Sequence, residues 1–184
     1  IILKVQGCGS RRRSFDIRLP FAYTVYKGAG MMFDQEKFRA LVHYVCWKCK
    51  DPAMLGATKL NKILWLADFL SYRETGDSIT GASYVKRQFG PVPRAILPAL
   101  RQLEKEGSVT AEDTDYHGLP KKQFYVHKEP QTSAFSSSQL NLIDTVIAYV
   151  CEGHTAKSIS DQSHDHIWEA AKDGEEIPYA TVFA

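Results

Sequence analysis

The stretch that decides the fold runs from Thr58 to Gly107 and reads TKLNKILWLADFLSYRETGDSITGASYVKRQFGPVPRAILPALRQLEKEG. Its first part predicts a helix over about Lys59 to Arg73, because apolar residues recur at helical spacing and Thr58 can cap the first free amides. The recurring apolar residues are Leu60, Ile63, Leu64, Ala67 and Leu70, and Trp65, Leu66 and Phe69 widen their arc. We therefore expect this helix to be buried on most sides and to lie at the centre of the domain.

A turn-rich stretch of polar and aromatic residues follows, from Glu74 to Pro93. Pro91 and Pro93 prevent helix up to this point, because proline fixes φ and lacks an amide hydrogen. Pro93 is well placed as the first residue of a second helix, over about Arg94 to Glu106. Pro98 lies inside it, so this helix either starts late, with Pro98 in its first turn, or kinks there. The residues expected to face the core are Ile96, Leu97, Leu100 and Leu103.

A helix before the central stretch is predicted to begin at Asp34, whose side chain can accept from first-turn amides. Phe33 and Phe38 are placed to pack against each other across this start. Pro52 ends the helix, and the short connection from Pro52 to Gly56 implies packing against the central helix. Its expected core face comprises Phe38, Leu41, Val42, Val45, Cys46 and Cys49.

After the second helix of the central stretch, the sequence predicts two short strands, Ser108 to Glu112 and Gln123 to Lys128. A helix followed by a hairpin is the outline of a winged helix. Two more helices follow, one capped by Ser137 or Ser138 and one running from Thr155 through Gln162.

Together these elements predict a mainly α fold, a compact domain of about five helices with a small, winged-helix-like β-hairpin. We expect one domain over residues 31–184. Residues 1–30 are rich in arginine and glycine and poorly periodic, and they predict a poorly structured extension outside the domain. A basic arm for nucleic acid is the alternative. The tail from Trp168 to Phe183 alternates large apolar groups with acids, so we expect it to pack aromatic side chains onto the body.

Charge is unevenly spread along the chain, although the formal net charge is only +2. Residues 59–106 carry eight bases and five acids, whereas residues 159–179 carry one base and six acids. The basic middle and the acidic tail therefore either meet in the folded chain or face different partners. No apolar run approaches the roughly 18–20 residues of a membrane span, and four cysteines form no disulfide framework. We expect a cytoplasmic protein with no membrane partner.

Several motifs occur in a set order. The chain carries Lys59-Leu60-Asn61-Lys62 and Ile63 to Asp68, then Ile79-Thr80-Gly81, Tyr84, and Phe89 to Pro93. A later segment carries Ser163-His164 and then Trp168 to Tyr179. In order and spacing, these motifs resemble the Panacea domain, the SocA-like antitoxin family, over roughly residues 33–183.

The resemblance implies a bacterial antitoxin of a two-gene toxin–antitoxin pair. Its partner would be a cognate toxin, neutralised by direct protein binding or by delivery to a AAA+ protease, with the chain as a proteolytic adaptor. Antitoxins often repress their own operon, so operator DNA stays open as a further partner. The alternative function is that of a winged-helix DNA-binding transcriptional regulator, which the helix–hairpin outline and the basic middle favour.

Basic and aromatic residues interleave in the turn-rich stretch, and they form the candidate partner-binding site. These residues are Tyr84, Lys86, Arg87, Phe89 and Arg94. Such a mixture supplies area and directional hydrogen bonds at protein interfaces, and it can also grip phosphates and stack on bases. The alternative is that the two aromatics are core residues and the lysine and first arginine are solvated.

Asn61 and Asp68 are polar residues at or beside the apolar face of the central helix. Buried polar groups need partners, so we expect both to be structural and to bond the backbone of the glycine-rich linker.

No motif supports nucleophilic catalysis or phosphate binding, so we predict a binding protein and no enzyme, catalytic residue, cofactor or metal. Cys46-x-x-Cys49 and Cys151-x-x-His154 do have the spacing of zinc ligands. The cysteines fall on apolar helix faces, however, where a free cysteine packs as a small hydrophobe. Zinc binding is the alternative. The cluster His164-Asp165-His166 is interpreted as a helix cap or turn.

Overall fold

The computed structural model describes residues 32–183 with the exception of residues 50, 117 and 165. The prediction for residues 1–30 therefore lies outside the described residues. Within the described part there are six α-helices, one 3-10 helix and two antiparallel hairpins, so the mainly α fold is confirmed. In chain order the elements are α1 (Gln35–Lys48), α2 (Pro52–Thr75), β1 (Tyr84–Arg87), β2 (Gly90–Pro93), α3 (Ile96–Lys105), β3 (Val109–Tyr116), β4 (Leu119–Val126), α4 (Ser137–Gly153), α5 (Ala156–Gln162), α6 (His166–Ala170) and the 3-10 helix η1 (Tyr179–Phe183).

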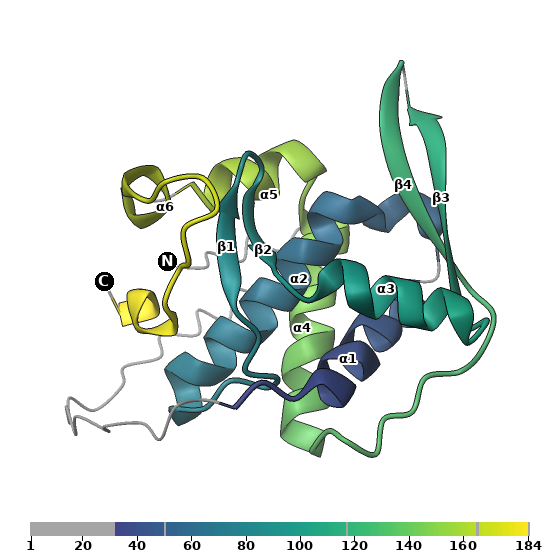
Figure 1. The fold of residues 1–184 in the computed structure, drawn as a ribbon, viewed down its shortest axis with the longest axis horizontal. Helices are drawn as coiled ribbons and strands as arrows, with labels where there is room; N and C mark the ends of the chain where they lie inside the picture. The colour runs from purple at the N-terminus through teal and green to yellow at the C-terminus, as the bar shows by residue number, and fades with distance from the viewer. Residues whose placement is uncertain (1–31, 50, 117, 165, 184) are drawn as a thin grey trace, which may run out of the picture.

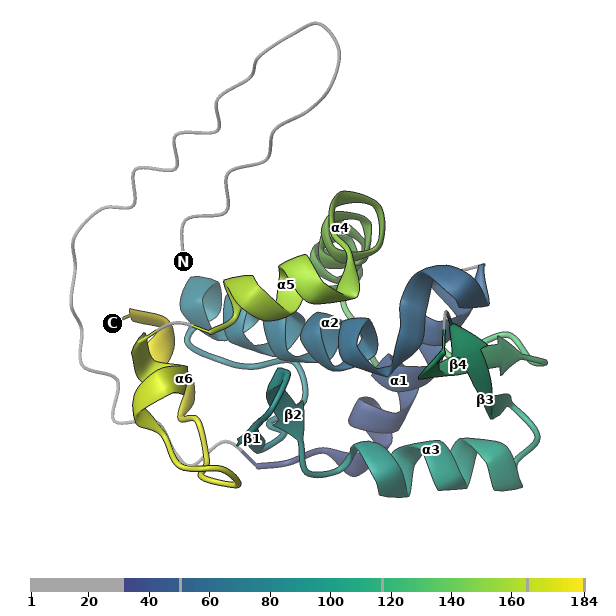
Figure 2. The same cartoon turned by 90° about the horizontal axis from the view of Figure 1, so that it is seen from above.

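Helix α2 occupies the centre of the molecule. It lies between α4 and α5 on one side and α1, α3 and the β1–β2 hairpin on the other (Figure 1, Figure 2). Its apolar residues Leu60, Ile63 and Leu64 are at most 1% exposed. The predicted central, largely buried helix is confirmed.

The start of α2 differs from the prediction. Asp51 is its N-cap and accepts a hydrogen bond from the Ala53 amide at 2.8 Å. Gly56 interrupts the helix with φ 67° and ψ 163°, and the helix continues beyond it. The segment beyond Gly56 agrees with the predicted helix over about Lys59 to Arg73, although Thr58 lies inside α2 and is not its N-cap. The short segment before Gly56, capped by Asp51, was not predicted, and the non-helical backbone of Gly56 separates it from the rest of the helix.

Helix α1 begins as predicted. The Asp34 side chain accepts from the Lys37 amide at 2.9 Å, and the rings of Phe33 and Phe38 meet edge-on at 5.8 Å. The predicted core face is buried: Phe38, Leu41, Val42, Val45, Cys46 and Cys49. Local capping signals were sufficient to locate this helix.

A β-hairpin that was not predicted lies in the turn-rich stretch. Strands β1 and β2 pair antiparallel from Tyr84 opposite Pro93 to Arg87 opposite Gly90. Pro93 therefore ends a strand and does not begin a helix. Both prolines of β2 are compatible with this short strand, because they only remove amide donors that the pairing does not need.

Helix α3 starts at Ile96, so Pro98 lies in its first turn, which is the first of the two predicted alternatives. Its buried residues are Ile96, Ala99, Leu100 and Leu103. Leu97 is 60% exposed, and the prediction that it faces the core is wrong. The reason is that α3 buries only one narrow face, on which Ala99 takes the place expected for Leu97.

The second hairpin is longer than predicted. Strands β3 and β4 pair from Val109 opposite Val126 to Tyr116 opposite Leu119, and Gly118 adopts a positive φ in the tight turn. This hairpin projects away from the helical body beside α3 (Figure 1). The long loop expected between two short strands is instead part of the strands themselves.

The C-terminal helices begin at capping boxes. Ser136 caps α4 together with Gln139, one residue before the predicted Ser137 or Ser138, and Thr155 caps α5 as predicted. The Ser136 cap lies at the start of the serine run, where either neighbour would have been chemically equivalent.

The C-terminal tail packs onto the body, as predicted. It runs along β1, with the Lys86 amide donating to the Glu175 carbonyl at 2.8 Å and the Ile177 amide donating to the Tyr84 carbonyl at 2.8 Å. Beyond this pairing, the ring of Tyr179 stacks on Phe69 at 4.5 Å.

Leu64→Ala is expected to lower the free energy of unfolding by about 2–5 kcal/mol, because Leu64 is fully buried and its removal leaves a cavity. Urea denaturation measures this change. The matched control is Leu97→Ala, whose exposed side chain should leave stability within about 0.5 kcal/mol of wild type. Equal effects of the two variants would contradict the packing described for α2.

Candidate functional site

Tyr84 is a core residue. It is 1% exposed, and its hydroxyl donates to the Asp68 carboxylate at 2.7 Å and lies 2.9 Å from the Leu64 carbonyl. The pKa of Tyr84 is raised well above its ordinary value, chiefly because the hydroxyl is buried and secondly because the negative charge of Asp68 is close. Tyr84 therefore offers no surface to a partner in this structure.

Asp68 anchors the hairpin to α2. Its carboxylate accepts from the Thr80 amide at 2.8 Å, from the Thr80 hydroxyl at 2.6 Å and from Tyr84. This bears out the prediction that Asp68 bonds the backbone of the glycine-rich linker. Burial raises the pKa of Asp68, and the three donors oppose that effect. The base of β1 is therefore held by a buried polar network.

Lys86 is engaged by the C-terminal tail. Its amine lies 4.2 Å from the ring centre of Trp168 and donates to the carbonyls of Ala171 at 2.8 Å and Glu169 at 3.2 Å. The ring of His164 stacks on this same Trp168 ring, with the two ring centres 3.6 Å apart. Lys86 thus holds the tail in place, and its amine is already used within the chain.

Arg87 and Arg94 also reach the tail but remain exposed. Arg87 pairs with Asp173 at 2.8 Å, and Arg94 donates to the Gly174 carbonyl at 3.3 Å. The basic middle and the acidic tail therefore meet in the folded chain. Because the Arg87–Asp173 pair is more than half exposed, it adds little to stability and leaves both charges available at the surface.

A groove opens at the tip of the β1–β2 hairpin, against the first turns of α2. We call it the hairpin groove, and its volume is about 410 Å³. Phe89, at the tip, is 58% exposed. The residues that line the groove are Ala57, Thr58, Asn61, Arg87, Gln88, Phe89, Pro91, Val92 and Asp173. Of the five predicted contact residues, Arg87 and Phe89 therefore share one cavity.

Asn61 lies on the α2 side of the hairpin groove. Its Oδ1 atom is buried and has no hydrogen-bond partner among the described residues, in contrast to the bonded Asp68. The prediction that Asn61 bonds the linker backbone is therefore wrong for this atom. An unsatisfied buried amide oxygen costs about 1–3 kcal/mol. Sequence reasoning recognised the polar residue but could not see that it faces a groove.

Lys62 lies beneath the hairpin tip and was not predicted as a functional residue. It is 1% exposed, and its amine has no hydrogen-bond partner among the described residues. A Cβ atom at Gly90 would fall 1.6 Å from the Lys62 Nζ atom, and the φ of 105° at Gly90 independently favours glycine. Burial lowers the pKa of Lys62 to about 7. The sequence signal that could have indicated a special role for Lys62 is its position in the middle of the most apolar helix.

A second, small cavity of about 20 Å³ borders Lys62, and Trp65 and Ser163 also line it. This volume is close to that of one water molecule. Its lining is mostly apolar, so it is a packing defect beside the lysine and not a ligand pocket of useful size.

The cysteines and histidines do not converge on a metal centre in the described part of the chain, where no group of three or more His, Cys, Asp or Glu residues could hold an ion. Cys49 and Cys151 face each other, with their sulfur atoms 2.8 Å apart, and Cys46 is buried. His154 instead contacts the Ser158 hydroxyl at 3.2 Å. The zinc alternative gains no support from this arrangement. Over the same described residues, no helix is both long and apolar enough to cross a bilayer.

Comparison with protein families found one match. Residues 60–169 match the family described as antitoxin SocA-like, Panacea domain, which is more than half of the chain. The matched region begins in α2, ends in α6 and contains the hairpin groove's principal walls. Searches of curated proteins and of solved structures found no match.

Lys62→Met, which keeps an unbranched side chain one atom shorter and removes the amine, is expected to stabilise the protein at pH 7 by a few kcal/mol. The pKa of Lys62 is about 7 in the folded protein and 10.5 in its ordinary state. Between these pH values the unfolded chain binds more protons, so the Lys62 contribution to stability rises with pH. The advantage of the variant should therefore be largest at pH 7 and below, and should shrink by pH 9.

Urea denaturation from pH 6 to pH 9 measures this difference. Lys157→Met is the control, because the Lys157 side chain is 85% exposed and its removal should change stability little. An advantage of Lys62→Met that is independent of pH would show that the amine is not desolvated in the folded protein.

Proposed function

The chain belongs to the antitoxin SocA-like, Panacea-domain family, and from this we propose that it neutralises a cognate toxin by direct protein–protein binding. In this proposal the chain occludes the toxin and catalyses no reaction. Its partner is a protein, and its place of action is the cytoplasm.

The observation that carries the proposal is the hairpin groove. Phe89 exposes an aromatic ring at the rim, Arg87 exposes a guanidinium beside it, and both types of side chain are enriched among the residues that dominate protein interfaces. The groove volume of about 410 Å³ suits a few side chains of a partner segment rather than a whole helix.

The chemistry of the walls suggests which segment would bind. An apolar side chain would pack against Phe89 and Val92, and a hydrogen-bond donor would satisfy the buried Asn61 Oδ1 atom. Arg87 and Asp173 offer opposite charges at the rim, so a partner carboxylate would replace Asp173 as the ligand of Arg87. We propose an extended toxin segment with one apolar anchor residue and one acidic residue.

Delivery of the toxin to a AAA+ protease is a second possible outcome of the same binding event. The β3–β4 hairpin projects from the body on the side away from the C-terminal tail (Figure 1). Its surface can therefore bind a second protein while a toxin segment fills the hairpin groove. The half-life of the toxin, measured with and without this chain in protease-positive and protease-deficient cells, distinguishes an adaptor from a simple inhibitor.

The DNA-binding alternative has the order α3, β3, β4 in its favour. The β3–β4 hairpin, however, carries the acids Glu112, Asp113 and Asp115 against the bases Lys121 and Lys122. A wing with an excess of acids is repelled by phosphates, so we favour a protein partner. A gel shift with the promoter of its own operon at physiological salt tests this choice, and tight, steeply salt-dependent binding would reverse it.

Phe89→Ala is expected to weaken binding to the protein encoded by the adjacent reading frame roughly tenfold or more, because it removes the exposed anchor of the groove. Binding is measured by calorimetry with the purified pair, and rescue of growth is measured in cells that express the neighbouring protein.

The control is Phe183→Ala. Phe183 is similarly exposed at 55%, but it contacts Tyr72, which lies fourteen residues or roughly 20 Å along α2 from Thr58. Equal binding by both variants would place the interface elsewhere, and an adjacent protein that neither harms cells nor binds this chain would overturn the proposed function.

A further inference from the structure

Two buried thiols face each other where α1 and α4 end. Cys49 is the C-cap residue of α1, and Cys151 lies in the last turn of α4. Their sulfur atoms are 2.8 Å apart, and the residues are 8% and 7% exposed. This separation is only roughly 0.8 Å longer than a disulfide bond, which measures about 2.05 Å. A small side-chain movement would therefore bring the sulfurs to bonding distance.

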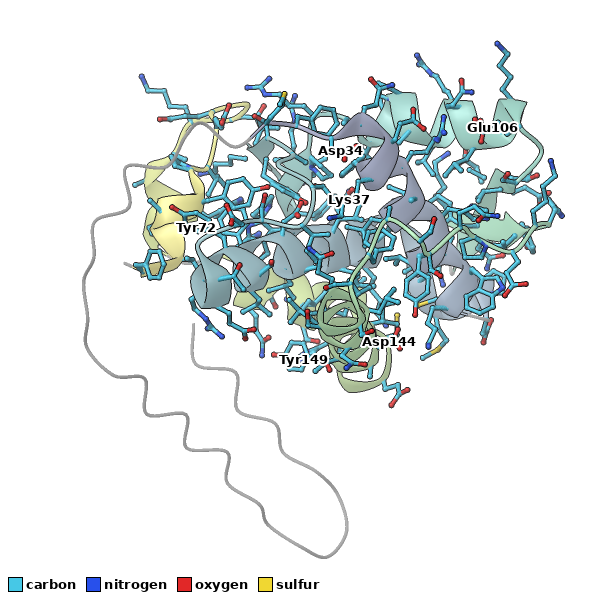
Figure 3. All side chains as sticks on the ribbon, turned by 90° about the horizontal axis from the view of Figure 1, so that it is seen from below. Asp34, Lys37, Tyr72, Glu106, Asp144 and Tyr149 are labelled. Carbon is cyan, nitrogen blue, oxygen red and sulfur yellow. The ribbon has the colours of Figure 1, made fainter. Side chains whose placement is uncertain are left out.

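The two helices are tied together on the same side. Asp144 of α4, which is labelled in Figure 3, accepts from the Tyr44 hydroxyl at 2.7 Å and from the Lys48 amine at 2.8 Å, both of α1. Along α4, Asp144 lies two turns before Cys151, and along α1, Tyr44 and Lys48 lie five residues and one residue before Cys49. These bonds keep the two thiols opposite each other in the reduced protein.

The surroundings favour reaction at Cys151. The hydrogen bond from Cys49 lowers the pKa of the Cys151 thiol, and the positive charge of Lys59 acts in the same direction. The Lys59 amine donates to the Cys151 carbonyl at 3.2 Å, which holds that charge nearby. Cys46 differs, because burial alone raises its pKa to about 12 and it has no sulfur partner among the described residues.

We propose that Cys49 and Cys151 are a redox modification site, at which a hydroperoxide converts the thiol pair into a reversible disulfide. The Cys151 thiolate attacks one peroxide oxygen, forms a sulfenic acid and releases water after protonation, or an alcohol where the oxidant is organic. The Cys49 sulfur then attacks the sulfenic sulfur, and the second oxygen leaves as water. Two thiols are oxidised, the peroxide bond is reduced, and a dithiol restores the pair by exchange.

The disulfide would link positions 102 residues apart. A cross-link over so long a loop restricts the unfolded chain, so the oxidised protein is expected to melt at a higher temperature than the reduced protein. The link would also fix the ends of α1 and α4 beside Lys59, one residue from Thr58 of the hairpin groove.

Peptide mapping of the full chain tests the proposal. The reduced protein is treated with a small molar excess of hydrogen peroxide, blocked with iodoacetamide and digested with trypsin. Cleavage after Lys48 separates Cys46 from Cys49, because Cys46 then lies in residues 40–48 and Cys49 in residues 49–50. The expected product is residues 49–50 joined to residues 129–157, which dithiothreitol splits again.

Cys46→Ala should still form the cross-linked peptide, whereas Cys49→Ala should not and should instead accumulate oxidised Cys151. The wild-type map is decisive even if a variant folds poorly, since it needs no substitution. Cysteines 49 and 151 that both stay alkylated, or that become sulfinic acids without cross-linking, would overturn the proposal.

Discussion

The buried carboxylate of Asp68 joins the centre of the core to the β1–β2 hairpin. It sits inside α2 with no solvent contact, and its oxygens are satisfied by Thr80 and Tyr84. Because an unpaired buried carboxylate would be very costly, these bonds determine where the chain turns after α2 and where β1 begins. The tail in turn pairs with β1. The positions of the β1–β2 hairpin, the hairpin groove and the C-terminal tail therefore all depend on Asp68.

The two ends of the hairpin are held very differently. At its base the polar network around Asp68 is complete, whereas at its tip Gly90 rests on the unpartnered amine of Lys62. A buried, unpaired ammonium is costly, and this cost falls when the amine loses its proton. The tip is also held by α5, because the Phe89 carbonyl accepts from the Ser160 hydroxyl at 3.1 Å.

Membership of the antitoxin family and the hairpin groove support each other at different levels. The family assigns a class of biological role, and the groove supplies a surface with an exposed aromatic ring and a cation. The acidic tail already occupies part of this cationic surface through Asp173 and Gly174. A carboxylate of a partner that binds here would replace that of Asp173 beside Arg87. Charge would therefore decide which partner binds more than how tightly it binds.

Much of the architecture was predictable because its signals are local. Asp34, Thr155 and the phenylalanine pair at positions 33 and 38 act within a few residues, and the apolar spacing of α2 reports its own burial. The start of α2 was misjudged because Gly56 at positive φ allowed a kinked extension that no periodicity indicates. The β1–β2 hairpin was missed since two of its eight residues are prolines, which argue against strand in isolation.

The sequence alone determined the helical class, the core faces of α1 and α2, and the set of basic and aromatic residues from which a site could be built. Only the tertiary structure decided that Tyr84 is internal, that Lys86 clasps the tail, and that Phe89 remains exposed beside Arg87. It alone brought Lys62 under Gly90 and Cys49 against Cys151. The physical reason is range: caps and periodicity depend on neighbours within one or two turns, whereas these pairings depend on how elements tens of residues apart pack together.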